Sequence, residues 1–222
     1  MSAVLDIGIW IGLWVVTFGT FALLRKKGIS YNKNYGWTIL YFLIFTTISC
    51  LYFKDILVDV TAKFTIVPLI ILVFIYILTV VIYYFSHKYL KKPAKLIEKY
   101  SDQHFIKMDY KYLFSKLFDI LFQQVMITVL VLWLSKEFFS MTQIIIYFIL
   151  LFGIVHLIGI SIAGKIFGTY YLIMSLIGAV IFPILILNVN YGFVYNFIIH
   201  FLFYSISSLL FWLYAEKLLK IS

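Results

Sequence analysis

The chain has 222 residues, of which 64% are hydrophobic and only 12% are charged, and its formal net charge is +9. Soluble domains carry about a quarter charged residues, so this composition excludes an ordinary soluble fold and predicts a polytopic membrane protein. The length fits roughly six to eight spans with short connections, so we expect residues 1–222 to form a single transmembrane domain. A basic excess can indicate nucleic-acid binding, but the sequence has no base-stacking or groove-reading module, and we expect no nucleic-acid partner.

Seven apolar runs follow one another along the chain, and each is long enough to cross a bilayer as a helix. They are too long and too continuously apolar for barrel strands, which alternate at every second residue over about ten positions. The sequence therefore predicts an all-α transmembrane bundle of about seven spans. The predicted spans are approximately Val4–Leu24, Gly36–Phe53, Thr65–Phe85, Leu113–Leu134, Gln143–Ala163, Thr169–Leu187 and Phe193–Tyr214.

Basic residues gather in every second connection. Fifteen of the 18 lysines and arginines fall on one side of the membrane if the spans alternate, and only Lys54, Lys63 and Lys136 fall on the other. Because connections rich in lysine and arginine stay inside, this bias predicts an outer amino terminus and an inner carboxyl terminus. The basic inner loop, residues 86–112, can open a short helix at Pro93. It either rests on anionic lipid headgroups, at about 1 kcal/mol for each lysine, or is only the loop that the positive-inside rule requires.

The fourth span carries three polar side chains that lipid cannot solvate. Asp119 and Gln123 lie four residues apart, so a helix places them on one face, with Gln124 beside them. An aspartate at the bilayer centre costs roughly 2.5 to 3.5 kcal/mol even on the lenient insertion scale. We therefore expect this face to turn toward protein or water and to find polar partners on other spans.

Two later spans supply polar side chains at a similar depth. The fifth places Phe152 and His156 one turn apart, and the seventh carries a polar stripe at every fourth position. At 1.5 Å per residue, Asp119 and His156 lie about 10 Å from the inner surface and His200 about 21 Å from it. We expect a cavity that opens inward and into which Asp119, His156 and His200 point. The stripe consists of Asn196, His200, Tyr204 and Ser208.

Simpler roles are open to these groups. A lone histidine inside a membrane often bonds a serine or a backbone carbonyl of a neighbouring helix. Asn196 and Ser208 suit packing positions, and Gln124 suits a bond between helices. Asp119 and the two histidines could form a metal site of two imidazoles and one carboxylate. They come from three spans without a closely spaced ligand pair, so we expect no metal and no other cofactor.

Three motifs in the second half of the chain resemble those of the CPBP group, which includes the type II CAAX prenyl endopeptidases and bacterial relatives linked to bacteriocin immunity. That group carries EExxxR in one span, FxxxH in the next and HxxxN two spans later. The corresponding segments here are FDILFQ at Phe118–Gln123, FGIVH at Phe152–His156 and HFLFY at His200–Tyr204. The resemblance covers about residues 110–214. It implies a CPBP-like core in spans four to seven, and we expect a prokaryotic cytoplasmic membrane.

The resemblance implies hydrolysis of a peptide bond inside the membrane by a glutamate-activated water, with the last His and Asn of the motifs holding the oxyanion. Phe118 stands in place of the first Glu, which is the general base, and Asp119 matches the second Glu. Gln123 replaces the Arg, and Tyr204 replaces the Asn. One residue turns a side chain by about 100° around a helix, so Asp119 does not inherit the position of the base.

Two functions remain open, and we favour the first. In the first, the chain is a CPBP-like protein without peptidase activity that binds a membrane protein or an amphiphile, such as a lipopeptide, in a polar cavity. Alternatively, it is an active intramembrane endopeptidase in which Asp119 or a histidine activates water and Tyr204 donates a hydrogen bond to the oxyanion. The catalytic candidates are Asp119, His156, His200 and Tyr204, and the cavity candidates are Phe118, Gln123, Gln124, Phe152, Asn196 and Ser208.

Overall fold

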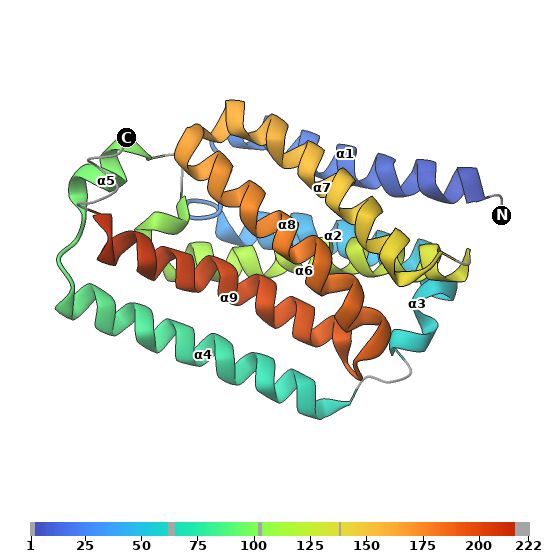
Figure 1. Ribbon diagram of the computed structural model, residues 1–222. Helices are drawn as coiled ribbons and strands as arrows, with labels where there is room; N and C mark the ends of the chain where they lie inside the picture. Colours follow the sequence, from blue (N-terminus) through green and yellow to red (C-terminus); the bar gives the residue numbers. More distant parts are fainter. Residues whose placement is uncertain (1–2, 62–64, 102–103, 138, 216–222) are drawn as a thin grey trace.

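The computed structural model describes residues 3–61, 65–101, 104–137 and 139–215, and within these ranges all regular structure is helical (Figure 1). In these ranges seven long helices are joined by short connections and three short helices. The long ones are α1 (Ala3–Lys26), α2 (Tyr35–Tyr52), α4 (Ile66–Tyr89), α6 (Tyr110–Lys136), α7 (Met141–Ala163), α8 (Lys165–Asn188) and α9 (Gly192–Leu213). The short ones are α3 (Lys54–Thr61), α5 (Ala94–Lys99) and the 3₁₀ helix η1 (His104–Lys107).

Each of the seven predicted spans corresponds to one of the long helices. In the part of the chain that the structure describes, α1, α2, α4, α6, α8 and α9 are long and apolar enough to cross a membrane. Helix α7 has 23 residues, and its segment Met141–Leu157 is apolar. The prediction of an all-α transmembrane bundle is therefore confirmed.

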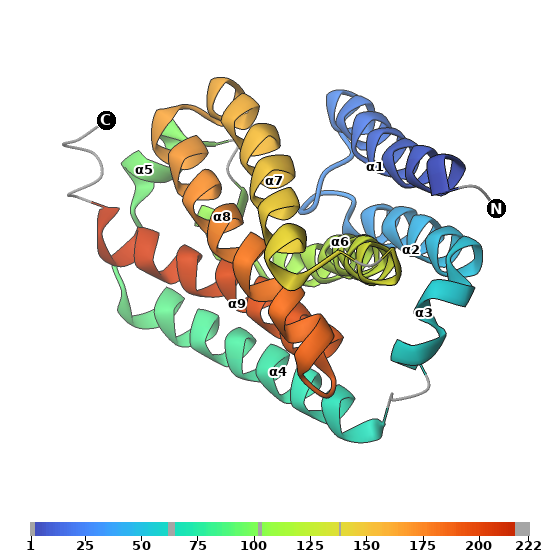
Figure 2. The same cartoon turned by 45° about the vertical axis from the view of Figure 1, so that its right-hand side comes forward.

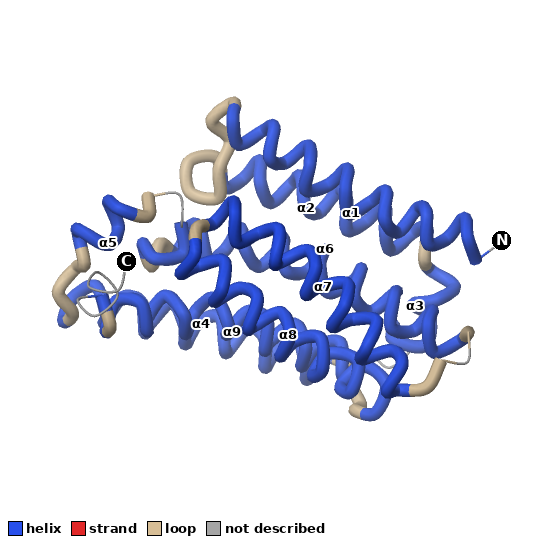
Figure 3. The backbone as a smooth tube through the Cα atoms, turned by 45° about the horizontal axis from the view of Figure 1, so that its top comes forward, coloured by secondary structure: helices blue, strands red, loops and turns tan. Residues whose placement is uncertain are grey.

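Helix α6 forms the centre of the bundle (Figure 2). In the most apolar 18-residue stretch of α6, 67% is buried inside the bundle, whereas the figure is 17% for the corresponding stretches of α1, α4 and α8. It packs against α2 on one flank and against α8 and α9 on the other (Figure 3). Asp119, Gln124 and Thr128 on this helix have no exposed surface. The polar face of the fourth span is thus turned toward protein, as the cost of leaving it in lipid requires.

The basic loop, described over residues 86–101 and 104–112, lies at the end of the bundle where α4 finishes (Figure 1). Helix α5 buries Leu96, and its lysines stay exposed. Trp212 of α9 donates a hydrogen bond from Nε1 to the carbonyl oxygen of Ile106 at 2.5 Å. Nε2 of His87 lies 2.9 Å from the carbonyl oxygen of Met108. The loop is therefore anchored to α4 and α9, while most of its lysines are exposed: Lys88, Lys91, Lys92, Lys95 and Lys99.

Helices α7 and α8 form a tight hairpin. Gly164, which joins them, has a φ of +80°, in the left-handed region that favours glycine. At Gly168 a Cβ atom would lie only 2.4 Å from the Cα atom of Ile160, so a larger residue would push the two helices apart. This close approach holds α7 and α8 together as one wall of the site described next.

Candidate functional site

Asp119 is fully buried, and both of its carboxylate oxygens accept hydrogen bonds. The ammonium of Lys116 lies 2.5 Å from Oδ2, and the hydroxyl of Tyr31 donates to the same oxygen at 2.8 Å. Nε2 of Gln123 donates to Oδ1 at 2.8 Å. Lys116 is itself buried, with its ammonium 4.2 Å from the centre of the Tyr204 ring. The pair neutralises its own charge, which is what allows an ammonium and a carboxylate to stay out of water.

Tyr31 reaches Asp119 from the connection between α1 and α2. Its carbonyl oxygen accepts a hydrogen bond from the Ser115 hydroxyl at 2.9 Å, and Asn32 donates to Asp109 at 2.6 Å. Asp109 is the N-cap of α6, so the connection is fastened to the beginning of that helix. Burial, followed by the charge of Asp119, raises the pKa of the Tyr31 phenol well above its ordinary value. The phenol therefore stays protonated and continues to donate its hydrogen bond.

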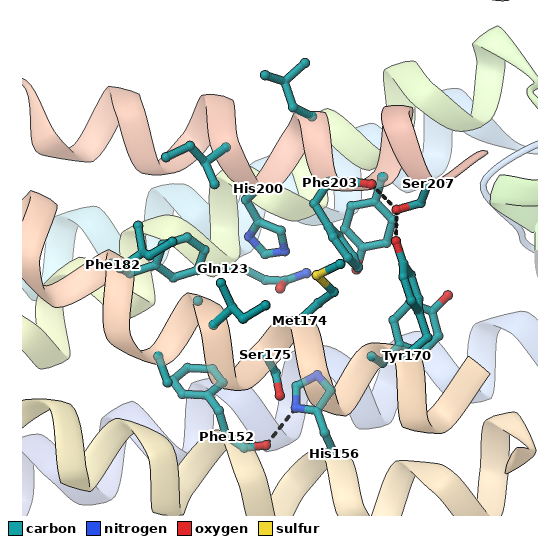
Figure 4. Close-up of a pocket in the computed structure, with 18 of the residues that line it drawn as sticks. Gln123, Phe152, His156, Tyr170, Met174, Ser175, Phe182, His200, Phe203 and Ser207 are labelled. Atoms are coloured by element: carbon teal, nitrogen blue, oxygen red, sulfur yellow. Dashed lines mark hydrogen bonds between the residues drawn. The ribbon is translucent and has the colours of Figure 1, made fainter. Parts of the chain in front are cut away.

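A cavity of about 400 Å³ lies next to this network, between α7, α8 and α9, and α6 contributes to its lining (Figure 4). Its volume is within the range of sites for small molecules, about 300 to 1,000 Å³. Four of its lining residues, Ile177 on α8 and Ile199, Ile206 and Leu210 on α9, are also 39–51% exposed. The cavity therefore reaches the outer surface of the bundle between α8 and α9. In a membrane-spanning bundle, that surface faces lipid.

His200 projects from α9 into the cavity and is fixed on three sides. Its ring lies between the rings of Phe182 and Tyr204, with centroids 5.7 Å away in both cases. Its Nδ1 lies 2.9 Å from Nε2 of Gln124 on α6. The remaining nitrogen, Nε2, is the one left to meet a molecule in the cavity.

His156 enters the cavity from α7, on the side opposite His200 (Figure 4). Its Nδ1 lies 2.8 Å from the carbonyl oxygen of Phe152, one turn earlier in the same helix. This bond is local and fixes the ring without tying α7 to another helix. His156 thus also keeps its Nε2 for the cavity.

The cavity brings together five of the predicted site residues, Gln123, Phe152, His156, His200 and Tyr204. Asp119 does not line it, contrary to the prediction that its carboxylate shares a cavity with the two histidines. The carboxylate has no accessible surface, because Lys116, Tyr31 and Gln123 enclose it. In this structure the carboxylate therefore does not face a water molecule of the cavity, whereas a general base acts from within hydrogen-bond reach of the water that it activates.

Four further predicted cavity residues also lie outside the lining. Gln124 instead joins α6 to α9. Asn196 donates a hydrogen bond to a carbonyl oxygen of α8 at 3.0 Å, and Ser208 donates to a carbonyl oxygen one turn earlier in α9 at 2.8 Å. Phe118 packs within α6 against the ring of Phe114. These residues connect and pack helices, so they shape the cavity without facing it.

Two residues of the charged network were missed by the sequence reasoning. The sequence groups Lys116 with the basic inner side, although a lysine three residues before an aspartate on a helix is the signal of an ion pair. Tyr31 gives no such signal, because it lies 88 residues away from Asp119 in a connection. The cavity lining also includes Tyr170, Met174 and Ser175 of α8, whose predicted span Thr169–Leu187 has no charged or histidine side chain to draw attention to it.

Comparisons with known protein families, with curated proteins and with solved structures give no match for this chain. The resemblance to the CPBP group stays a prediction from three motifs.

Proposed function

We propose that this chain is a membrane protein that takes an amphiphilic molecule from the lipid phase, binds it in the cavity between α7, α8 and α9, and does not cleave it. The observation that carries this proposal is that four residues of α8 and α9 line the cavity and are also exposed on the outer surface of the bundle, from which we infer an opening to the lipid. Most lining side chains are apolar, and the polar ones among them include Gln123, His156 and His200. Such a site suits a molecule with an apolar tail and a small polar group.

The absence of hydrolysis is inferred from the state of Asp119. Family-type hydrolysis needs a carboxylate that holds a water, and both oxygens of Asp119 are committed to Lys116, Tyr31 and Gln123. Phe118, which stands where the CPBP motif has its general base, packs against the ring of Phe114. The peptidase alternative then depends on His156 and His200 alone.

The proposal includes a CPBP-like core in the second half of the chain that has no peptidase activity. The segments Phe152–His156 and His200–Tyr204 both contribute to the cavity lining, and Phe118–Gln123 contributes Gln123. The partner is then an amphiphile, such as a lipopeptide, or the membrane segment of another protein. The bilayer opening favours the amphiphile.

The orientation in a cytoplasmic membrane is part of the same proposal. The end of the bundle that carries α5 faces inward, because the basic connections lie there, and the amino terminus lies outside. The lysines of α5, Lys95 and Lys99, are exposed and would contact anionic headgroups. Labelling of single cysteines placed at the two ends of the bundle, in intact cells, tests this orientation.

Photo-cross-linking tests the cavity. Purified protein in nanodiscs is irradiated with a lipid analogue that carries a diazirine in its acyl chain, and the labelled peptides are identified by mass spectrometry. We expect label on α8 and α9 around Met174 and Phe203, which line the cavity. The variant Ser175→Phe fills the cavity and should remove this label. The matched control Ile173→Phe adds the same side chain to the same helix at a position that is 51% exposed and outside the lining, and it should keep the label.

Two results would contradict the proposal. Equal labelling of Ser175→Phe and Ile173→Phe would mean that the label comes from the lipid-facing surface and not from the cavity. Cleavage of a fluorescent membrane peptide by the wild type that is lost in both His156→Ala and His200→Ala would establish the peptidase alternative instead.

A further inference from the structure

We infer that the polar group bound in this cavity is an uncharged secondary amide, whose carbonyl oxygen accepts a hydrogen bond from His200 and whose N–H donates one to His156. This inference rests on the proposed function, since it names the chemical class of the amphiphile that the same cavity binds. It follows from the protonation pattern that the neighbours of the two histidines impose.

The contact with Gln124 determines which ring nitrogen of His200 carries the hydrogen. In this structure the Gln124 amide is oriented with Nε2 2.9 Å from Nδ1 of His200, and an amide nitrogen carries two hydrogens and accepts none, so in this orientation it donates to Nδ1. Nδ1 is then the accepting nitrogen, and the ring cannot be the doubly protonated cation, in which both nitrogens are donors. A neutral imidazole with an accepting Nδ1 carries its hydrogen on Nε2. His200 therefore offers the cavity one donor, in a ring whose plane is fixed between Phe182 and Tyr204.

The hydrogen of His156 is placed by its own helix. The carbonyl oxygen of Phe152 can only accept, so Nδ1 of His156 carries the hydrogen in their 2.8 Å contact. In the neutral ring, Nε2 is then an acceptor. Among the described residues no acidic side chain lines the cavity, and a second proton on His156 would leave a cation in apolar surroundings without a counter-charge. His156 therefore offers the cavity one acceptor.

The two histidines together present one donor and one acceptor from opposite sides of the cavity (Figure 4). A trans secondary amide matches this pattern, because its C=O and N–H are separate atoms that point in opposite directions. Gln123 adds a further acceptor beside them, its amide oxygen, while one of the two N–H groups of its Nε2 donates to Asp119. An N–H in this part of the cavity thus finds acceptors on α7 and on α6.

Other polar groups match the pattern less well. Esters and tertiary amides can bond His200, but they bring no hydrogen to His156. Carboxylates and phosphates bring only acceptors and a negative charge, and the nearest cation, Lys116, is already paired with Asp119. Burying an unpaired charge or an unpaired acceptor is costly, so the site rejects these groups.

Four probes that each contain a twelve-carbon chain test this selectivity: N-dodecylacetamide, its N-methyl derivative, dodecyl acetate and dodecanoate. Each competes for the full-length protein in detergent micelles against radiolabelled N-dodecylacetamide. We expect the secondary amide to bind about tenfold more tightly than the N-methyl amide and the ester, which is the usual size of one hydrogen bond in affinity. Dodecanoate should bind most weakly.

The variants assign each half of the amide to one histidine. In His156→Phe the advantage of the secondary amide over the N-methyl amide should disappear, whereas binding of the ester stays unchanged. In His156→Gln, whose side-chain oxygen restores an acceptor, the advantage should return. His200→Phe should weaken the secondary amide, the tertiary amide and the ester by the same factor. The ratio of two probes within one variant does not depend on how much of that variant is folded.

Equal affinity of the wild type for the secondary amide, the N-methyl amide and the ester would overturn the inference but leave the proposed function standing. A preference for dodecanoate would overturn it as well. If none of the probes binds, and the diazirine lipid also fails to label α8 and α9, the proposed function fails together with the inference.

Discussion

Two polar regions lie side by side in the membrane part of this bundle, and they use their hydrogen-bonding groups in opposite ways. The charged network of Lys116 and Asp119 is closed, because Tyr31 and Gln123 donate hydrogen bonds to the same carboxylate that Lys116 contacts. In the cavity, His156 and His200 each spend one ring nitrogen on the protein and keep the other. The charges thus stabilise the contact between α6 and the α1–α2 connection, and neutral groups are left for a ligand.

The largest expected effect comes from breaking the closed region. Replacing Asp119 by Leu leaves the buried ammonium of Lys116 without its counter-charge, and we expect a loss of about 3 to 5 kcal/mol in the free energy of unfolding. The measurement is denaturant unfolding of the purified protein in detergent.

The double variant Lys116→Met/Asp119→Leu is the control for that experiment. It removes both charges and keeps an apolar filling, so most of the lost stability should return. If the double variant is as unstable as Asp119→Leu, the carboxylate contributes through groups other than Lys116, and the account of a self-neutralising pair is wrong.

A smaller effect is expected when one neutral member of the network is removed. Tyr31→Phe deletes a single hydrogen bond to a carboxylate, and such bonds contribute about 1.5 to 3 kcal/mol. The same unfolding experiment measures it. A loss below about 0.5 kcal/mol would mean that the α1–α2 connection is held by Ser115 and Asn32 and that Tyr31 adds nothing.

The fold was predictable from the sequence, but the partners of Asp119 were not. Seven apolar runs and their basic connections suffice for the helices, because a bilayer leaves the backbone few alternatives. The need of Asp119 for partners also follows from its cost in lipid. Its actual partners are Tyr31, whose position depends on how one connection folds, and Lys116, whose side chain turns inward to the aspartate.

The cavity was predictable only in part. Helical spacing puts Phe152 beside His156 and His200 beside Tyr204, and all four line the cavity. Spacing does not tell which side of α6 faces the cavity. It therefore does not predict that Gln123 and Gln124, although adjacent in sequence, have different roles. Gln123 lines the cavity, and Gln124 is buried between α6 and α9.

The contribution of Tyr31 to the free energy of unfolding should depend on pH. Burial raises the pKa of Tyr31 above its unfolded value of about 10, so its bond to Asp119 is fully present below pH 10 and is lost as the pH rises toward the raised value. The stability difference between the wild type and Tyr31→Phe should be constant from about pH 7 to 9 and should shrink above about pH 10. Midpoints of thermal unfolding across this range measure it. A difference that grows above pH 10 would contradict a protonated donor.

The smallest effect on stability is expected in the open region. His156→Ala removes one bond within α7 at a half-buried position next to an empty volume, so the free energy of unfolding should change by about 1 kcal/mol or less. Binding of the amphiphile should nevertheless weaken. A loss as large as that of Asp119→Leu would mean that His156 belongs to the structural network and not to the cavity.

The most direct test of the account is a side-chain-resolution structure of the protein in lipid nanodiscs. We expect elongated density that enters between α8 and α9 and ends near His200, with Asp119 still covered by Lys116 and Tyr31. A closed gap between α8 and α9, together with an Asp119 carboxylate that opens onto a water in the cavity, would contradict both the binding site and the separation of the two polar regions.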